Sequence, residues 1–128
     1  MRLALEEVAD GVASVAEGDL RKLIRSGRLP EPLYNAKLYV GSEFLAQPDV
    51  WWRDFGVAGE VDSREWHLSP EQWAKTMARH ARMTAQGIFA LHFTPKRIRQ
   101  DRAGVLAELR SAIEAARQRP PLPIRTIP

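Results

Sequence analysis

The feature that most constrains the fold is a helix with clear start and stop signals, set between two short segments. Ser69 is a suitable N-cap, Pro70 suits the first helical position and Gly87 suits the end, so a helix is predicted between them. The flanking segments 57–62 and 88–93 have the length and apolar content of strands. Two strands joined through a helix are expected to run parallel in one sheet. The sequence therefore predicts an α/β fold.

Turn residues divide the remainder of the chain into further short elements. We expect helices over residues 3–12 and 14–25, and strands over residues 36–40 and 44–52. A last helix is expected over residues 101–117. In chain order, helix, three strands, helix, strand and helix then surround a small mixed sheet.

One domain accounts for most of the length. A chain of 128 residues can bury a single hydrophobic core without disulfides or metals. We divide it into a partial N-terminal helical lead-in over residues 1–13, a main domain over residues 14–117 and a proline-rich extended tail over residues 118–128.

Composition excludes several classes of protein. The chain has no cysteine, which rules out disulfides, thiolate metal sites and a cysteine nucleophile. No apolar run approaches the ~20 residues of a membrane span, and acids occur where a signal peptide would remain apolar. The glycine and histidine motifs of nucleotide-binding loops, serine hydrolases and zinc proteases are absent. We therefore expect a soluble cytoplasmic protein that does not bind a membrane.

Positive charge is concentrated toward the C-terminus. Residues 94–128 hold eight basic residues against three acids, a net charge of +5, so residues 1–93 carry −2 of the overall +3. A basic end on a mildly acidic body can attract a polyanion such as nucleic acid. On charge alone, an ordinary arginine-rich helix facing solvent is the more common explanation of this pattern.

Three acids near two predicted strands are candidates for a metal site. A turn before residue 57 would bring Asp49 close to Glu60, while Glu60 and Asp62 share one face of a regular strand. Converging carboxylates repel each other, so either their pKa values rise or a cation lies among them. Oxygen ligands suit Mg²⁺ or Mn²⁺, and such an ion assists phosphodiester hydrolysis.

Each candidate residue also has a structural interpretation. Acids at strand ends often face solvent or form ion pairs with arginines. Glu17 either completes a capping box with Ser14 or presents an acid toward a metal. His67 is a candidate general acid or base, or a phosphate contact, but a histidine in this setting can also be a packed or surface residue. His80 and His92 follow the apolar periodicity of their segments, so we interpret both as structural.

Several segments, taken in order, form a distinctive pattern: Glu17, Pro48–Trp52, Glu60–His67, Trp73, Arg79 and Arg82 before Gly87, and Leu91–Thr94. This pattern resembles the endonuclease-like domain family related to very-short-patch mismatch repair endonucleases, within the PD-(D/E)XK nuclease superfamily. Similar domains follow a winged-helix segment in actinobacterial proteins described as AbiEi-type antitoxins of type IV toxin–antitoxin systems. The resemblance covers roughly residues 14–117. It implies a restriction-endonuclease-like core.

The resemblance also implies roles for individual residues. Asp49 matches the metal-binding aspartate of the second core strand, Glu60 the acid of the (D/E)-x-K element, and Glu17 an acid of the first helix. His67 matches a histidine that takes part in cleavage in the repair endonucleases. Asp62 stands where the superfamily has lysine, so it is expected to add a metal ligand in place of orienting water. The zinc-binding cysteines of the repair endonucleases are absent.

Two functional hypotheses follow from these observations. The first is hydrolysis of DNA phosphodiester bonds with Mg²⁺ or Mn²⁺ held by Asp49 and Glu60, in which basic side chains contact phosphates. The expected phosphate contacts are Lys75, Arg79, Arg82, Lys96, Arg97 and Arg99. The alternative is a catalytically inactive nuclease-fold module that binds nucleic acid or a protein partner, such as a toxin or a regulatory protein.

Overall fold

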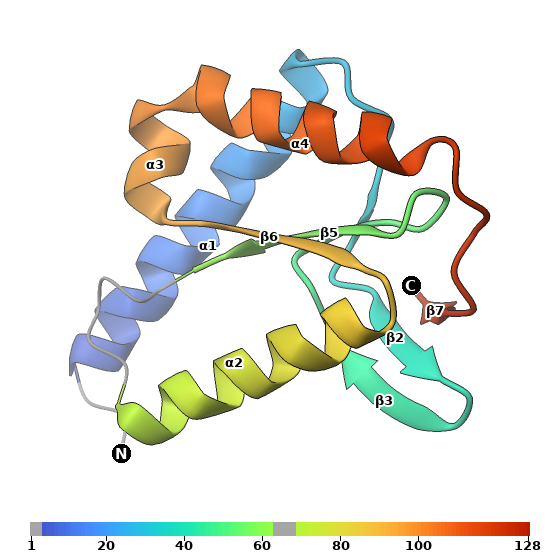
Figure 1. The fold of residues 1–128 in the computed structure, drawn as a ribbon. Helices are drawn as coiled ribbons and strands as arrows, with labels where there is room; N and C mark the ends of the chain where they lie inside the picture. Colours follow the sequence, from blue (N-terminus) through green and yellow to red (C-terminus); the bar gives the residue numbers. More distant parts are fainter. Residues whose placement is uncertain (1–3, 63–68) are drawn as a thin grey trace.

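The computed structural model describes residues 4–62 and 69–128, with side chains described from Ser14 onward apart from residues 63–68. Its elements, shown in Figure 1, are α1 (Ala4–Ser26), β1 (Leu33–Tyr34), β2 (Lys37–Val40), β3 (Glu43–Ala46), β4 (Val50–Trp52), β5 (Val57–Val61), α2 (Pro70–Ala85), β6 (Phe89–Phe93), α3 (Pro95–Gln100), α4 (Arg102–Ala116) and β7 (Arg125–Ile127). The expected α/β fold with a small mixed sheet is confirmed.

The strands form one mixed sheet and one antiparallel sheet. The first has the order β1-β4-β5-β6, and the second has the order β3-β2-β7. Strand β4 is antiparallel to β5, whereas β5 and β6 are parallel and are joined through α2. The predicted parallel crossover is therefore confirmed. Ser69 caps α2 as expected, within a capping box completed by the Gln72 side chain.

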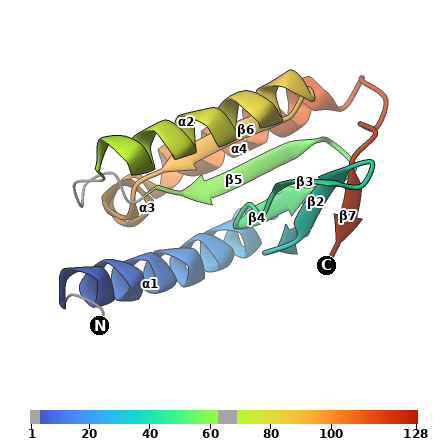
Figure 2. The same cartoon turned by 90° about the horizontal axis from the view of Figure 1, so that it is seen from below.

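Hydrophobic cores lie on both faces of the four-stranded sheet. Helices α1, α3 and α4 cover one face, and α2 with the three-stranded sheet covers the other (Figures 1 and 2). Neighbouring residues of β4 alternate between the two, because Trp51 packs toward α2 and Trp52 packs toward α1 and α4. This alternation also determines which polar side chains of β5 and β6 face α2.

Three predicted elements have different boundaries in the structure. Helix α1 runs without a break through residues 13 and 14, so Ser14 is a helix-interior residue and the expected capping box with Glu17 is wrong. The expected strand over residues 44–52 is divided into β3 and β4, which belong to different sheets. Pro48 lies between them, and proline cannot donate a hydrogen bond to a strand ladder.

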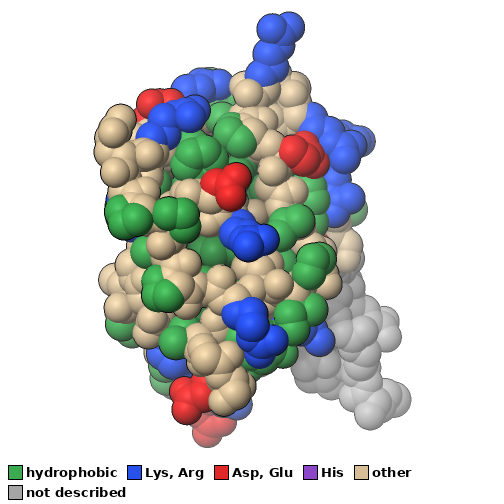
Figure 3. Space-filling view, turned by 90° about the vertical axis from the view of Figure 1, so that its right-hand side faces the viewer, with side chains coloured by type: hydrophobic (Ala, Val, Ile, Leu, Met, Phe, Trp, Pro, Cys, Tyr) green, Lys and Arg blue, Asp and Glu red, His purple; other side chains and the backbone are tan. Residues whose placement is uncertain are grey.

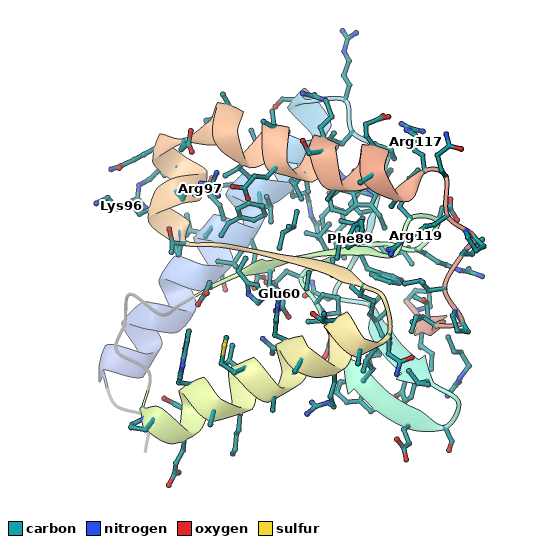
Figure 4. All side chains as sticks on the ribbon, viewed as in Figure 1. Glu60, Phe89, Lys96, Arg97, Arg117 and Arg119 are labelled. Carbon is teal, nitrogen blue, oxygen red and sulfur yellow. The ribbon has the colours of Figure 1, made fainter. Side chains whose placement is uncertain are left out.

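The C-terminal tail is attached to the domain by one arginine and a short strand. Arg119 donates hydrogen bonds to the carbonyl oxygens of Phe55 at 2.9 Å, Gly56 at 3.0 Å and Gly87 at 2.6 Å. Its guanidinium group also lies 4.2 Å from the centre of the Phe89 ring (Figure 4). Beyond this point β7 pairs with β2. On the side of the molecule that carries the tail, basic and hydrophobic side chains are interspersed and form no single charged patch (Figure 3).

Candidate acidic cleft

The acids singled out from the sequence line one cleft of about 260 Å³, which we call the acidic cleft. Its lining residues are Glu17, Gln47, Asp49, Glu60, Val61, Asp62, Thr76, Arg79 and His92. The structure thus brings together four of the five predicted catalytic residues. The fifth, His67, lies outside the described residues.

Strand pairing explains why Asp49 and Glu60 meet here. The antiparallel register pairs Val50 with Gly59, so Asp49 and Glu60 are the next positions along this ladder. Asp49 accepts a hydrogen bond from the backbone N–H of Val61 at 2.7 Å, which fixes its carboxylate beside β5. Glu17 reaches the same place from α1 and forms a side-chain hydrogen bond with Asp49.

Two of the carboxyl groups in the acidic cleft have raised pKa values. Burial, followed by the negative charge of Asp49, raises the pKa of Glu17 to about 7. Burial is also the main reason that the pKa of Glu60 is raised, and Asp49 and Asp62 add to this effect while Arg79 opposes it. Glu60 and Asp62 are both buried. The cleft therefore holds more negative charge than its own cationic groups offset.

One edge of the cleft is formed by a polar network on α2 and β6. The Nη2 atom of Arg79 lies 3.1 Å from Oε2 of Glu60, and Nδ1 of His92 lies 3.6 Å from the same oxygen. Nδ1 of His80 in turn lies 2.9 Å from Nε2 of His92. Among the described residues, no partner is found for the buried Nε of Arg79. Two histidines that were interpreted as structural thus extend the cleft network.

Helix α2 faces the sheet with a polar stripe, which was not expected. Its more buried residues are Thr76, Arg79, His80 and Met83, at the i, i+3, i+4 and i+7 spacing of one helix face. The large apolar residues Trp73 and Met77 of the same helix are 37% and 39% exposed. The signal for the network was nevertheless present in the sequence. A parallel pairing of residues 57–61 with 89–93 places His92 beside Glu60.

The donor set of the acidic cleft suits a cation that takes few protein ligands. In the part of the chain that the structure describes, no three histidine or acidic residues are grouped so as to hold a metal ion. Mg²⁺, however, is commonly bound through one or two carboxylates, with water and substrate phosphates as the other ligands. Within the described residues, Arg79 and His92 both contact Oε2 of Glu60, and no hydrogen bond or ion pair reaches Oε1. Asp49 and Glu60, which both line the cleft, are the two carboxylates that could serve such an ion.

Of the six predicted phosphate contacts, two form ion pairs with described acidic residues and four do not. Arg79 binds Glu60, and Arg97 forms ion pairs with Asp101 at 3.2 Å and Glu108 at 2.8 Å. The other four are exposed and form no ion pair with any described residue: Lys75, Arg82, Lys96 and Arg99. Figure 4 shows Lys96 and Arg97 on α3, at the end of β6.

A second cleft lies next to the acidic cleft and was not anticipated. It also measures about 260 Å³, and we call it the Tyr34 cleft. Its lining residues are Ser14, Glu17, Gly18, Leu20, Arg21, Tyr34, Asn35, Asp49 and Val50. Glu17 and Asp49 line both clefts, which are therefore adjacent.

Comparisons of the chain with family models, with curated proteins and with solved structures found no match. None of the helices in the described ranges combines the length and hydrophobicity needed to cross a membrane. Functional conclusions for this chain therefore rest on the geometry and chemistry of the two clefts.

Proposed function

We propose that the acidic cleft binds Mg²⁺ or Mn²⁺ through Asp49 and Glu60, and that the chain hydrolyses DNA phosphodiester bonds there. The observation that carries this proposal is the convergence of four carboxyl groups in one cleft, two of them with raised pKa values. Burial is the main cause of both raised pKa values, and the repulsion between the carboxylates that adds to it favours occupation by a cation. When bound, such an ion neutralises charge on a phosphate and activates water.

The order of the core elements supports the proposal. A helix precedes β1, β4 and β5, and α2 then crosses to the parallel strand β6. Asp49 comes just before β4, and Glu60 lies on β5. The resemblance to restriction-endonuclease-like nucleases implies a helix, three strands, a crossover helix and a further strand in this order. The predicted strand over residues 36–40 differs from that expectation, because β2 belongs to the three-stranded sheet and β1 takes the place beside β4. Fold alone does not establish activity, so the carboxyl cluster remains the main argument.

The remaining residues of the cleft have supporting roles in this proposal. Asp49 is held in place by the Val61 N–H, and Arg79 orients Glu60 through one of its two oxygens. Glu17 and Asp62 add negative charge around the metal ligands. The exposed basic side chains of α2 and α3 would contact phosphates, which orients DNA without reading its sequence.

Cleavage of supercoiled plasmid in Mg²⁺ or Mn²⁺ tests the proposal. The variants Asp49→Asn and Glu60→Gln should each lower the cleavage rate by at least about 100-fold, since each removes a charge that holds the ion. Asp54→Asn is a matched control, because Asp54 is an exposed acid in the turn between the same two strands. Cleavage that is equal in all four proteins, or absent from the wild type, would refute the enzymatic proposal.

A second candidate function is favoured by the contact between Arg79 and Glu60. This arginine already neutralises part of the charge that a metal would neutralise, and an acid stands where a nuclease lysine is expected. We propose as the alternative an inactive nuclease-fold module that binds nucleic acid or a protein partner, such as a toxin. Salt-dependent DNA binding without cleavage in either metal would favour this alternative, and metal-dependent turnover would contradict it.

A further inference from the structure

We propose that the Tyr34 cleft is a nucleotide subsite, which holds the nucleotide next to the scissile phosphate and binds its phosphate group through Arg21. This inference rests on the proposed nuclease function for the identity of the ligand. The subsite itself is argued from the cleft's own side chains, and it can be tested without cleavage.

Arg21 is the cation of the Tyr34 cleft and is held in a defined position. Its guanidinium carbon lies 3.9 Å from the centre of the Tyr34 ring, so the planar group is stacked on the aromatic face. Among the described residues, none forms an ion pair with Arg21. Stacking uses the face of the guanidinium group and leaves its N–H edges available. Those edges match a phosphate in bidentate geometry.

The remaining lining suits the sugar and base of a nucleotide. Leu20 and Val50 are buried apolar residues, whereas Ser14 and Asn35 supply polar groups. The wall at Asn35 is fixed, because its backbone N–H donates to the Asp49 carbonyl at 3.1 Å and its carbonyl accepts from Gln47 at 2.9 Å. A mixed apolar and polar lining beside a cation that forms no ion pair with a described residue suits a nucleotide, although Glu17 and Asp49 on the border of the cleft offset part of the charge of Arg21.

The position of the Tyr34 cleft connects it to the proposed reaction. Glu17 and Asp49 form its boundary with the acidic cleft, so a strand whose scissile phosphate lies at Asp49 would place an adjacent nucleotide here. The two clefts share the carboxyl groups of Glu17 and Asp49, but Arg21 lines only the Tyr34 cleft, whereas Glu60 and Asp62 line only the acidic cleft. The acidic cleft would take a metal-bound phosphate, and Arg21 would bind a phosphate directly.

Gly18 offers a way to block the subsite without disturbing the protein. It lines the Tyr34 cleft within α1, and a Cβ atom at this position meets no other atom within 4 Å. Replacing a helix-interior glycine with leucine also favours the helix. Gly18→Leu should therefore fold and fill the cleft, which complements the loss of charge in Arg21→Gln.

The test uses the 5′-phosphorylated dinucleotide pTpT in EDTA, titrated into ¹⁵N-labelled protein and followed by amide chemical shifts. We expect shifts at Arg21, Tyr34 and Asn35, with binding weakened by at least about tenfold in Arg21→Gln and in Gly18→Leu. Lys22→Gln is the matched control, because Lys22 is an exposed cation one position along the same helix and does not line the cleft. It should bind within about twofold of wild type.

Defined outcomes would overturn the subsite. Absence of shifts at the cleft, or equal weakening by Arg21→Gln and Lys22→Gln, would contradict it. The same shifts with inorganic phosphate at equal affinity would show a general anion site and contradict nucleotide recognition.

The test also separates the subsite from the nuclease proposal. If pTpT binds at the cleft but plasmid is not cleaved, the subsite stands and the nuclease proposal fails. If plasmid is cleaved and both variants leave kcat and KM unchanged, the subsite fails and the nuclease proposal stands.

Discussion

Replacing Arg79 with methionine tests whether its ion pair with Glu60 stabilises the folded protein. Arg79 lies 3.1 Å from the Oε2 atom of Glu60, whose side chain is 7% exposed, while that of Arg79 is 38% exposed. Breaking a fully buried ion pair by removing one partner costs about 3–5 kcal/mol, and an exposed pair contributes about 0–1 kcal/mol. This pair is intermediate in exposure. We therefore expect Arg79→Met to lower the free energy of unfolding by about 2 kcal/mol near neutral pH.

The stability that Arg79→Met loses should increase as the pH rises. The pKa of Glu60 is raised in the folded protein, mainly by burial, and Arg79 opposes that rise. A group with a raised folded pKa contributes stability at low pH, which is lost as the pH rises through its folded pKa. Removing Arg79 raises this pKa further. The variant should therefore approach wild-type stability in acid, where Glu60 is protonated, and lose stability as the pH increases.

Urea unfolding followed by tryptophan fluorescence measures both effects, because Trp51 and Trp52 are buried. The matched control is Arg82→Met, on the same helix, whose exposed side chain forms no ion pair with a described residue. The double variant Arg79→Met with Glu60→Gln should recover most of the loss at high pH, since residue 60 then carries no charge that needs Arg79. A loss equal to that of Arg82→Met, or one that is the same at all pH values, would refute this account of the cleft.

Three further predictions concern single residues around the clefts and the tail. Glu17→Gln should leave the free energy of unfolding unchanged near pH 4 and raise it by on the order of 1 kcal/mol at pH 8, allowing for solvent screening. The reason is that the pKa of Glu17 is about 7 in the folded protein against an ordinary 4.5, so the wild type loses stability as the pH rises between these two pKa values. Thermal unfolding at both pH values checks this. Arg119→Ala should lower the free energy of unfolding by about 2–3 kcal/mol, because it removes charged hydrogen bonds to three carbonyl oxygens. Arg117→Ala removes only an exposed ion pair with a neighbouring glutamate and should lower it by under about 0.5 kcal/mol. Urea unfolding distinguishes the two variants. Tyr34→Phe should change the free energy of unfolding by no more than about 0.5 kcal/mol. The tyrosine hydroxyl is buried, and no hydrogen-bond partner is found for it among the described residues, so the variant loses no hydrogen bond there. A large loss of stability in thermal unfolding would contradict this.

Local signals predicted the central part of the fold well. The start of α2 is determined by hydrogen bonds within a few residues of Ser69, and these can be recognised from residue types alone. The crossover from β5 to β6 follows from the length of the connection and the handedness of such units. Once both strands were assigned, the meeting of Asp49 with Glu60 followed from a tight antiparallel turn.

The errors arose where tertiary contacts outweigh local patterns. The spacing of Ser14 and Glu17 matches a capping box, but the same spacing occurs inside any helix, and here α1 runs through both residues. In α2 the large apolar residues Trp73 and Met77 are more than a third exposed. The sheet opposite this part of α2 carries carboxylates, so the helix turns polar residues inward, and no single-helix pattern contains that information.

In the acidic cleft, the basic residue beside Glu60 comes from helix α2 and not from strand β5. The resemblance to PD-(D/E)XK nucleases implies a lysine two positions after the acid matched by Glu60, or a histidine as in the repair endonucleases, and here that position is Asp62. The cation beside Glu60 is instead Arg79, which comes from the crossover helix and contacts the carboxylate directly. An arginine on α2 cannot be found by reading along β5, because it requires the packing of two elements. The positive charge that is missing on β5 is therefore supplied to the cleft by Arg79. The two proposed functions differ in whether Arg79 assists a bound metal ion or takes its place.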